Sequence, residues 1–462
     1  MLDSSLVQST LTEALRTGGD FAEVFVEDRG SLGARLDDGR VEELTTSRDR
    51  GAGIRVIVGD STGFAHTSDL TESGLHRAAA TAAAMATAGK PGAVGSLGNP
   101  VGRSGPDVEI LPEGIDKATK VELLRRADET ARGIGDAITQ VTARYSEGRR
   151  RILVANSEGD HATDDQVRTL FSVSTVATGD SGRQTGRETV GHTVGYELFD
   201  RFSVDEIAEK AARQALTKLE ARPAPSGELP VVIARGSGGV LFHEACGHGL
   251  EADLVAKGAS VFAGRIGERV AAPGVTLVDD GTMVGEWGRI AIDDEGRPAG
   301  RHVLIEDGVL TDYMWDHLRA RAEGHRRTGN GRRQTYRHLP MVRMTNTFVE
   351  NGAEDPQAII AGTPRGVYVA KLGGGQVNTA TGDFVFGMVE AYLIEDGRLT
   401  EPLRDANLIG NGPQVLLDID ALGNDFAMGP PGTCGKDGQG VPVGDGQPTL
   451  RVRRLTIGGT AA

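Results

Sequence analysis

The sequence predicts an α+β fold with two domains, and three observations lead to that prediction. A chain of 462 residues exceeds what one typical core holds, so two domains are expected. In the first half of the chain, segments with hydrophobic residues at helical spacing alternate with segments at strand spacing. In the second half, the hydrophobic residues recur mostly at strand spacing. Between the halves, residues 221–227 carry two prolines and a glycine, which forbid continuation of a helix. We expect an N-terminal α/β domain with an antiparallel sheet and flanking helices at 1–222, and a β-rich catalytic domain at 228–462.

The first elements of the N-terminal domain are a helix and a meander. Apolar residues at helical spacing predict a helix over 3–17, which Gly18 and Gly19 end. Period-two spacing then predicts strands at 21–26, 32–36 and 54–58, with turns at 37–39 and 59–60. A second helix is expected at 68–88, followed by a loop or linker rich in Gly, Pro and Ser at about 89–106.

The same order of elements follows without an evident sequence repeat. A helix is predicted at 118–133 and a closing helix at 204–220. Between them, strands are predicted at 139–145, 152–155, 170–177 and 190–198.

The C-terminal domain begins with a strand, a turn and a helix. Residues 229–234 read as a buried strand, and the glycine-rich segment 236–239 turns it into a helix that begins near residue 240. Further strands are predicted at 275–278, 302–306, 366–372, 388–394 and 414–419. The segment from Arg319 to Arg343 is basic, and we interpret it as a solvated loop. The alternative is that some of its guanidinium groups bind a substrate carboxylate.

Composition excludes several classes of protein. The net charge of −15 argues against a nucleic-acid or anionic-membrane partner, because phosphate binding relies on clustered Lys and Arg. The two cysteines argue against a disulfide framework and favour a reducing compartment. The first residues have neither a basic nor an apolar signal region, and the alanine-rich run 78–88 is too short to cross a bilayer. We therefore expect a cytoplasmic protein with no membrane partner.

The segment 241–253 holds the most informative residues, His243, Glu244 and His248. Two imidazoles beside a carboxylate are typical of a metal-hydrolase site, although an ordinary buried His/Glu pair is the alternative. Residues five apart lie about 140° apart around a regular helix, so the two rings cannot both reach one ion. We predict a wide, π-type turn between them, which Gly247 tolerates.

A metal ion held by two imidazoles needs a third protein ligand. The candidates are Glu251, Asp253, Cys246 and Cys434, and the most promising is Cys434, in a glycine-rich loop where Lys436 could favour a thiolate. Glu244 is the natural general base. Glu251 and Asp253 are interpreted as partners of the His N–H groups or, equally, as structural and surface acids.

Five segments, in order, resemble the TldD/PmbA family of metallopeptidases, and specifically its metal-bearing TldD-like branch. They are Gly51–Val56, His243–Glu251 with its HExxxH pattern, Arg343–Thr347, Gly373–Asn378 with Thr381–Phe384, and Gly432–Lys436. The resemblance implies zinc bound by His243, His248 and Cys434, with Glu244 as the catalytic base. It also implies a dimer, often with a motif-less TldE/PmbA-like subunit, enclosing a cavity that admits unfolded peptides.

Our functional hypothesis is a zinc-dependent peptidase that hydrolyses unfolded peptides or short oligopeptides through metal-activated water, as a homodimer or heterodimer. Ligands of the His2Cys type also suit other transition metals. The glycine run from Gly373 lets a substrate backbone pair as an added strand, although it also suits a tight structural turn. The alternative function is a peptide-binding or peptide-maturation subunit whose metal is structural, which a fourth protein ligand would indicate.

Overall fold

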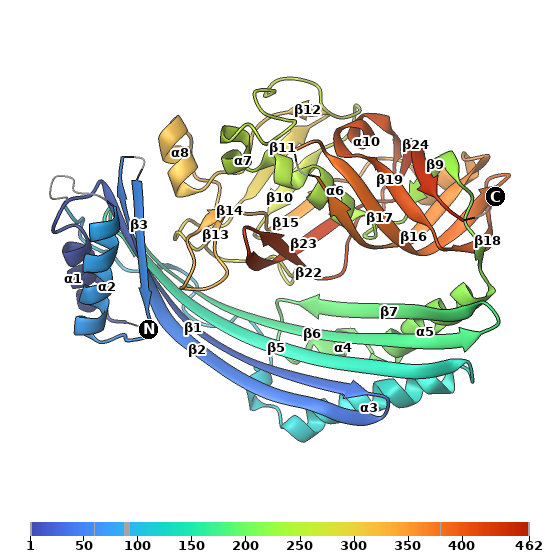
Figure 1. The fold of residues 1–462 in the computed structure, drawn as a ribbon, viewed down its shortest axis with the longest axis horizontal. Helices are drawn as coiled ribbons and strands as arrows, with labels where there is room; N and C mark the ends of the chain where they lie inside the picture. The colour runs from blue at the N-terminus through green and yellow to red at the C-terminus, as the bar shows by residue number, and fades with distance from the viewer. Residues whose placement is uncertain (1, 60, 87–92, 379, 461–462) are drawn as a thin grey trace.

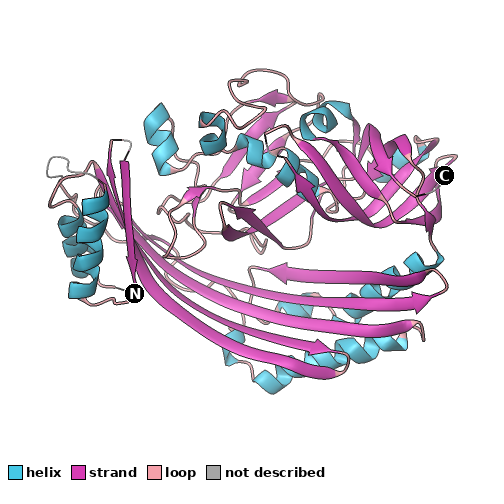
Figure 2. Cartoon of the chain, viewed as in Figure 1, coloured by secondary structure: helices cyan, strands magenta, loops and turns pink. Residues whose placement is uncertain are grey.

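The computed structural model describes residues 2–59, 61–86, 93–378 and 380–460. They form the α+β fold that the sequence predicts, arranged in two lobes. The N-terminal lobe is a long curved sheet with helices on its convex face, and the β-rich C-terminal lobe lies on the concave face (Figures 1 and 2). No helix among these residues is both long and apolar enough to span a membrane.

The N-terminal sheet runs β3–β2–β1–β5–β6–β7 with antiparallel neighbours, and the short β4 pairs parallel to β6. Its strands are β1 (Phe21–Asp37), β2 (Arg40–Val58), β3 (Ser61–Thr67), β4 (Val101–Gly102), β5 (Ile138–Asn156), β6 (His161–Gly179) and β7 (Gly182–His192). Asp38 and Gly39 turn β1 into β2 with φ of +48° and +77°, the left-handed backbone that a tight hairpin requires. The turn predicted at 59–60 includes residue 60, which lies outside the described residues.

Several strands are longer than their predicted segments. The strands expected at 139–145 and 152–155 are both part of β5, whose charged middle carries Arg149, Arg150 and Arg151. The strand expected at 190–198 is wrong beyond His192, because the chain turns away there. Glu197 accepts hydrogen bonds from the backbone N–H of Gly195, at 2.8 Å, and from residues 109 and 110.

The helices of this lobe cover the convex face in two groups (Figure 1). One group is α1 (Ser4–Ala14) and α2 (Glu72–Met85); the other is α3 (Lys117–Gly133), α4 (Leu198–Arg201) and α5 (Val204–Glu220), with a 3-10 turn at Pro112–Gly114. The side chain of Asp3 caps α1 by accepting from the Leu6 N–H at 2.9 Å. The end of the helix predicted at 68–88 and the start of the linker predicted at 89–106 fall at 87–92, outside the described residues. The rest of that linker contains β4.

The C-terminal lobe holds two sheets around one apolar core. The first contains β8 (Arg222–Pro223), β9 (Gly227–Ile233), β16 (Arg365–Val377), β17 (Asp383–Glu395), β18 (Arg398–Arg404), β19 (Asn407–Asn411), β20 (Ile419–Leu422) and β24 (Leu450–Gly458). The second contains β10 (Leu277–Asp280), β11 (Arg301–Glu306), β12 (Val309–Leu310), β15 (Asn346–Val349), β21 (Ala427–Met428), β22 (Gly432–Lys436) and β23 (Gln439–Gln447). A small hairpin pairs β13 (Gly331–Arg332) with β14 (Met341–Val342).

Short helices complete this lobe: α6 (Gly239–Ala245), α7 (Ala252–Ala256), α8 (His317–Glu323), α9 (Pro356–Ala361) and α10 (Gly412–Asp418). The strand predicted at 414–419 is wrong, since α10 occupies that segment. Pro413 lies in its first turn and the Asn411 side chain caps it, two local features that favour a helix start. The predicted domain ranges stay a prediction; β8, at the predicted boundary, pairs with β18.

Buried ion pairs join the two lobes. Arg55 of β2 bridges Glu23 of β1 and Glu295 of the C-terminal lobe, at 2.8 Å to each, and Arg333 pairs with the same Glu23. Arg150 of β5 makes further pairs to both lobes. Arg332, Arg333 and Arg343 are buried. The interpretation of 319–343 as a solvated loop is therefore wrong for these three arginines, because their charged groups hold the lobes and loops together.

Candidate metal centre

A strand, a glycine turn and a helix position the first two candidate ligands. After β9 the chain turns at Gly236, whose φ of +69° is left-handed and whose missing side chain leaves room for the Met428 carbonyl. Helix α6 begins at Gly239, where a Cβ atom would lie only 2.3 Å from a carboxylate oxygen of Asp445. The helix therefore enters the core close to β23, and His243 lies buried in its last turn.

The predicted departure from a regular helix between the two histidines is observed, but its predicted form is wrong. Helix α6 stops at Ala245, Cys246 adopts φ −127° and ψ −50°, and residues 247–250 form a 3-10 turn rather than a π-type bulge. Gly247 packs against Met344 so closely that a Cβ atom would lie 2.3 Å from its sulfur. The break turns the His248 ring toward His243, and the ring centroids lie 5.2 Å apart.

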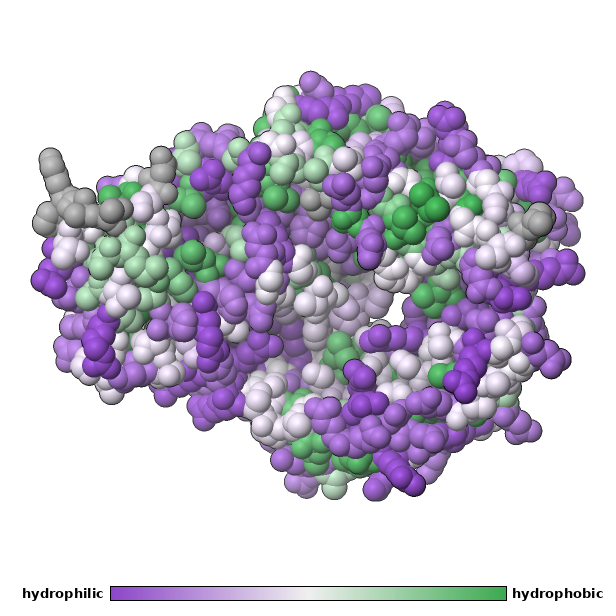
Figure 3. Space-filling view, viewed as in Figure 1, coloured by the Kyte–Doolittle hydropathy of each residue, from purple (hydrophilic) through white to green (hydrophobic). Residues whose placement is uncertain are grey.

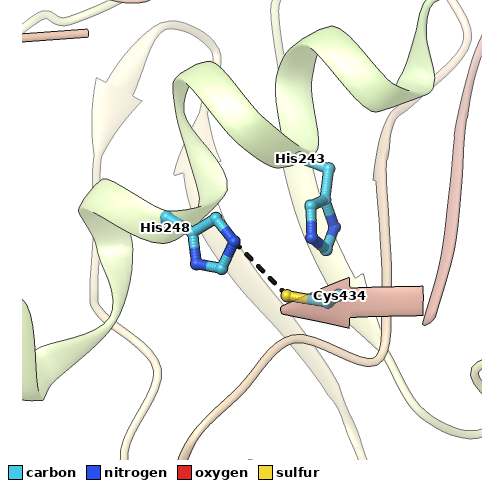
Figure 4. Close-up of side chains that lie close together, drawn as sticks. All are labelled: His243, His248 and Cys434. Atoms are coloured by element: carbon cyan, nitrogen blue, oxygen red, sulfur yellow. Dashed lines mark hydrogen bonds between the residues drawn. The ribbon is translucent and has the colours of Figure 1, made fainter. Parts of the chain in front are cut away.

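Cys434 reaches the two histidines from β22 (Figure 4). Its Sγ lies 3.3 Å from Nε2 of His248, across 186 residues of sequence. One ligand atom each from His243, His248 and Cys434 lie within 4.8 Å of one another. The three side chains are only 2%, 4% and 1% exposed, respectively. The structure thus brings together the three residues predicted as ligands.

The chemistry of these three side chains fits a transition metal. Neither ring nitrogen of His243 has a hydrogen-bond partner among the described residues, although both are buried. An unpartnered buried nitrogen costs free energy that a metal bond would offset. Burial acts to raise the pKa of Cys434, but the adjacent His243 and His248 lower it to about 4, which favours the thiolate that metals require. Three such ligands leave an open position on a tetrahedral ion.

A carboxylate and a lysine support His248 from its other side. Oε2 of Glu251 lies 2.9 Å from Nδ1 of His248, and Nζ of Lys436 lies 2.9 Å from the same oxygen and 2.7 Å from Asp253. Burial opposes ionisation of Glu251, but His248 and Lys436 lower its pKa to about 2. Lys436 therefore pairs with these two acids. Glu251 contacts His248 directly, while Asp253 contacts Lys436.

Glu244 and Asp445 lie beside the ligands. Oε2 of Glu244 lies 3.8 Å from Nε2 of His248, and its side chain is one-third exposed. Asp445, on β23, is buried; burial raises its pKa to about 6, while nearby His243 acts to lower it. Cys246, by contrast, packs in the apolar core, where burial raises the pKa of its thiol.

Sequence reasoning missed Asp445 and Arg343. The buried guanidinium of Arg343 donates to the carbonyl of Cys434 and to that of Gln439 at 3.2 Å, which ties it to both strands of the β22–β23 hairpin near the turn. Arg343 begins one of the five segments that carry the family resemblance, and this position was the feature of the sequence that could have identified it as part of the site. Asp445 lies outside those segments, and nothing in its local sequence marks it.

Family models match most of the chain. The models are described as PmbA/TldA metallopeptidase domain 1, central domain and C-terminal domain, and they match residues 22–86, 110–219 and 226–459. Among curated relatives, a "Metalloprotease TldD homolog" of Haemophilus influenzae is 39% identical over 96% of this chain and 93% of the relative. A "Metalloprotease" of Methanothermobacter thermautotrophicus is 36% identical over 92% of each chain.

Solved structures share the fold at lower identity. The crystal structure of TldE from Thermococcus kodakarensis has a TM-score of 0.79 at 20% identity, covering 98% of this chain and 100% of that one. A "putative modulator of a DNA gyrase" from Thermotoga maritima has a TM-score of 0.82, also at 20% identity, covering 98% and 99%. At this identity the likeness shows the fold alone. The family models and the curated relatives together show that the chain belongs to the TldD/PmbA family of metallopeptidases.

Proposed function

We propose that this protein is a zinc-dependent peptidase of the HExxxH type that cleaves unfolded peptides or short oligopeptides. One observation carries the proposal: His243, His248 and Cys434 converge on one buried point beside Glu244. The names of the relatives as metalloproteases support the reaction class, and one from Saccharolobus solfataricus, 26% identical over 94% of this chain, is named a zinc metalloprotease.

The ligand set and Glu244 have separate roles in this proposal. His243, His248 and the Cys434 thiolate would hold the ion. A zinc ion held there supplies a Lewis acid that lowers the pKa of water toward 7 and polarises a carbonyl group. Glu244 acts as general base, accepting a proton from the attacking water on its carboxylate and delivering it to the leaving amine. Its partial exposure suits this role, since water and substrate must both reach it.

A space between the lobes suits a peptide substrate. A cavity of about 770 Å³ is lined by β7 and α5 on one side, and by Ser237, Lys371 and residues 428–431 on the other. Figure 3 shows the molecule hollowed between its two lobes. Ser237 precedes α6, and Pro431 lies three residues before Cys434, so this cavity borders both segments that carry ligands.

The edge of β16 offers backbone groups for substrate binding. Gly375–Val377 pairs with β17 on one side, after an irregularity at Gly373 and Gly374, while β9 pairs only with residues 367–369 on the other. Among the described strands, this second edge has no partner beyond Val369, although the Leu372 N–H donates to Oγ of Ser237 at 2.8 Å. An extended peptide pairing there uses backbone hydrogen bonds, which accept many sequences.

The decisive experiment compares the wild-type protein with Glu244→Gln. We expect both to bind zinc equally, while the variant loses peptide hydrolysis by roughly two to four orders of magnitude. Equal hydrolysis by both proteins contradicts the role of Glu244. A wild-type protein that binds zinc through four protein ligands and cleaves no peptide supports instead the peptide-binding or peptide-maturation subunit with a structural metal.

Assembly and compartment complete the proposal. We propose a dimer with a second copy or with a TldE/PmbA-like subunit, the arrangement that the family resemblance implies. Light scattering of the protein purified from its own host tests this. We propose a cytoplasmic location, which the two free, buried cysteines support because disulfides are rare there.

A further inference from the structure

Residues of α8 and of the segment that follows it line a basic cavity. Helix α8 lies at the end of the C-terminal lobe nearest β3 (Figure 1). Its volume of about 360 Å³ falls in the range typical of small-molecule sites. A neighbouring hollow of about 570 Å³ shares four of its lining residues. The side chains that matter here are Arg297, His317, Arg321, His325, Arg326 and Arg327. None of these residues belongs to the candidate metal centre.

Three of the four arginines of this cavity have no acidic partner among the described residues. Burial acts to lower the pKa of the fourth, Arg327, but the facing Asp160, Asp293 and Glu295 raise it. The guanidinium groups of Arg297, Arg321 and Arg326 make no ion pair or hydrogen bond with any residue that the structure describes. Arg327 donates from Nη2 to Asp160 at 2.8 Å, but its Nη1 is buried and has no partner within the described ranges. The one acid in the lining is Glu158. In a chain of net charge −15, this local excess of positive charge attracts anions.

A buried histidine provides an independent indication of a ligand. His317 lines the cavity and is only 5% exposed, yet its Nε2 is buried without a hydrogen-bond partner among the described residues. The ring is fixed by stacking on Phe21, with centroids 3.9 Å apart, and the backbone N–H of His317 donates to Glu295 at 2.6 Å. Because His317 lines the cavity and its Nε2 has almost no accessible surface, a ligand atom that displaced the neighbouring side chains would give this nitrogen the partner it lacks.

We propose that this cavity binds a small oxyanion, either a phosphate group or the carboxylate of a peptide terminus. Guanidinium groups bind both by paired hydrogen bonds. The charge favours phosphate, because a phosphoryl group carries about −1.5 to −2 and a carboxylate only −1. The solvated-loop interpretation explains the exposed Arg321 and Arg326, but it leaves the buried nitrogens of His317 and Arg327 unexplained.

The test measures binding of inorganic phosphate and pyrophosphate to the full chain by calorimetry. Arg321→Ala and Arg326→Ala are suitable variants, since both side chains are exposed and hold no partner among the described residues. Arg125→Ala is the control; this arginine of α3 is also exposed and lies outside the cavity lining. We expect each cavity variant to weaken binding roughly tenfold or more, and the control to leave it unchanged.

Competition identifies the source of the oxyanion. A short peptide with a free C-terminus that displaces pyrophosphate, while its amidated form does not, supports the site and assigns it to a peptide carboxylate. Pyrophosphate binding that neither peptide disturbs supports the site and assigns it to phosphate groups. Absence of binding, or equal binding by the wild-type protein and both cavity variants, overturns the proposal and places any bound anion elsewhere.

Discussion

Nδ1 of His248 lies 2.9 Å from Oε2 of Glu251, and both side chains are buried. This contact implies the tautomer in which Nδ1 carries the hydrogen and donates to the carboxylate. In the neutral ring, Nε2 is then the nitrogen free to bind a metal, on the side facing Cys434 and 3.3 Å from Sγ. Carboxylates in this position orient a ligating histidine and increase its basicity.

We predict that Glu251→Gln lowers zinc affinity by roughly 10- to 100-fold without unfolding the chain. Glutamine keeps the shape but removes the charge that His248 and Lys436 both face. Chelator competition measures the affinity. Asp253→Asn is the matched control, because Asp253 contacts Lys436 but not His248, and it should leave affinity nearly unchanged. Equal losses in the two variants would assign the effect to Lys436 rather than to orientation of His248.

The two cysteines provide a second matched pair. We predict that Cys434→Ser purifies with clearly substoichiometric zinc, because a serine hydroxyl is a poor substitute for a thiolate ligand. Cys246→Ser should keep its zinc, since Cys246 packs in the apolar core and is not part of the ligand group. Elemental analysis of the purified proteins measures both. Full zinc content in Cys434→Ser would exclude Cys434 as a ligand.

The elements that the sequence predicted well have strong local signals. The helix expected at 204–220 is Val204–Glu220 in the structure, because its apolar residues repeat at helical spacing and Pro223 follows it. The long strands were predicted only in part. The first nine residues of β2, Arg40–Arg48, are exposed and mostly polar, so they lack the apolar alternation that reveals a half-buried strand. Arrangement of the lobes depends on pairs such as Arg55 and Glu295, 240 residues apart, which no local pattern predicts.

The candidate site shows the same limit. The five-residue spacing alone predicted that a regular helix cannot direct both His243 and His248 at one metal ion. The form of the break in the helix depends on Met344, which packs against Gly247. Cys434 was the most promising of four candidate ligands from the residues alone, and the family resemblance then implied it as the third ligand. Strand β23 places Asp445 in a buried position beside His243, and the sequence around Asp445 does not reveal that position.

The buried pairs between the lobes predict a stability effect. We expect Arg55→Met to lower the free energy of unfolding by about 3–5 kcal/mol, because it leaves Glu23 and Glu295 buried without this partner. Urea denaturation followed by circular dichroism measures the change. Arg77→Ala removes an exposed pair with Asp69 and should cost less than about 1 kcal/mol. Similar midpoints for the two variants would show that the pairs of Arg55 do not hold the lobes together.

A buried cap residue predicts a pH dependence of stability. Asp316 caps α8 by accepting from the Arg319 N–H at 2.8 Å, and burial together with nearby Glu295 raises its pKa to about 7. Its unfolded pKa lies near 3.8. Between these two values the folded chain holds this proton more tightly than the unfolded chain does. The contribution of Asp316 to stability is therefore largest below pH 4 and is lost as pH rises toward 7.

Asp316→Asn should remove the loss of stability that ionisation of Asp316 causes as pH rises, since asparagine keeps the capping oxygen and carries no charge. We expect the variant to be more stable than the wild-type protein at pH 8, and to lose that advantage as pH falls toward 4. Each pKa unit of difference between the folded and unfolded chains is worth about 1.4 kcal/mol. Asp3→Asn is the control: Asp3 also caps a helix, but it is exposed, and hydrogen bonds from Ser5 and Leu6 lower its pKa. Thermal unfolding from pH 4 to 8 measures the difference, and equal pH profiles for Asp316→Asn and the wild-type protein would show that Asp316 ionises without cost.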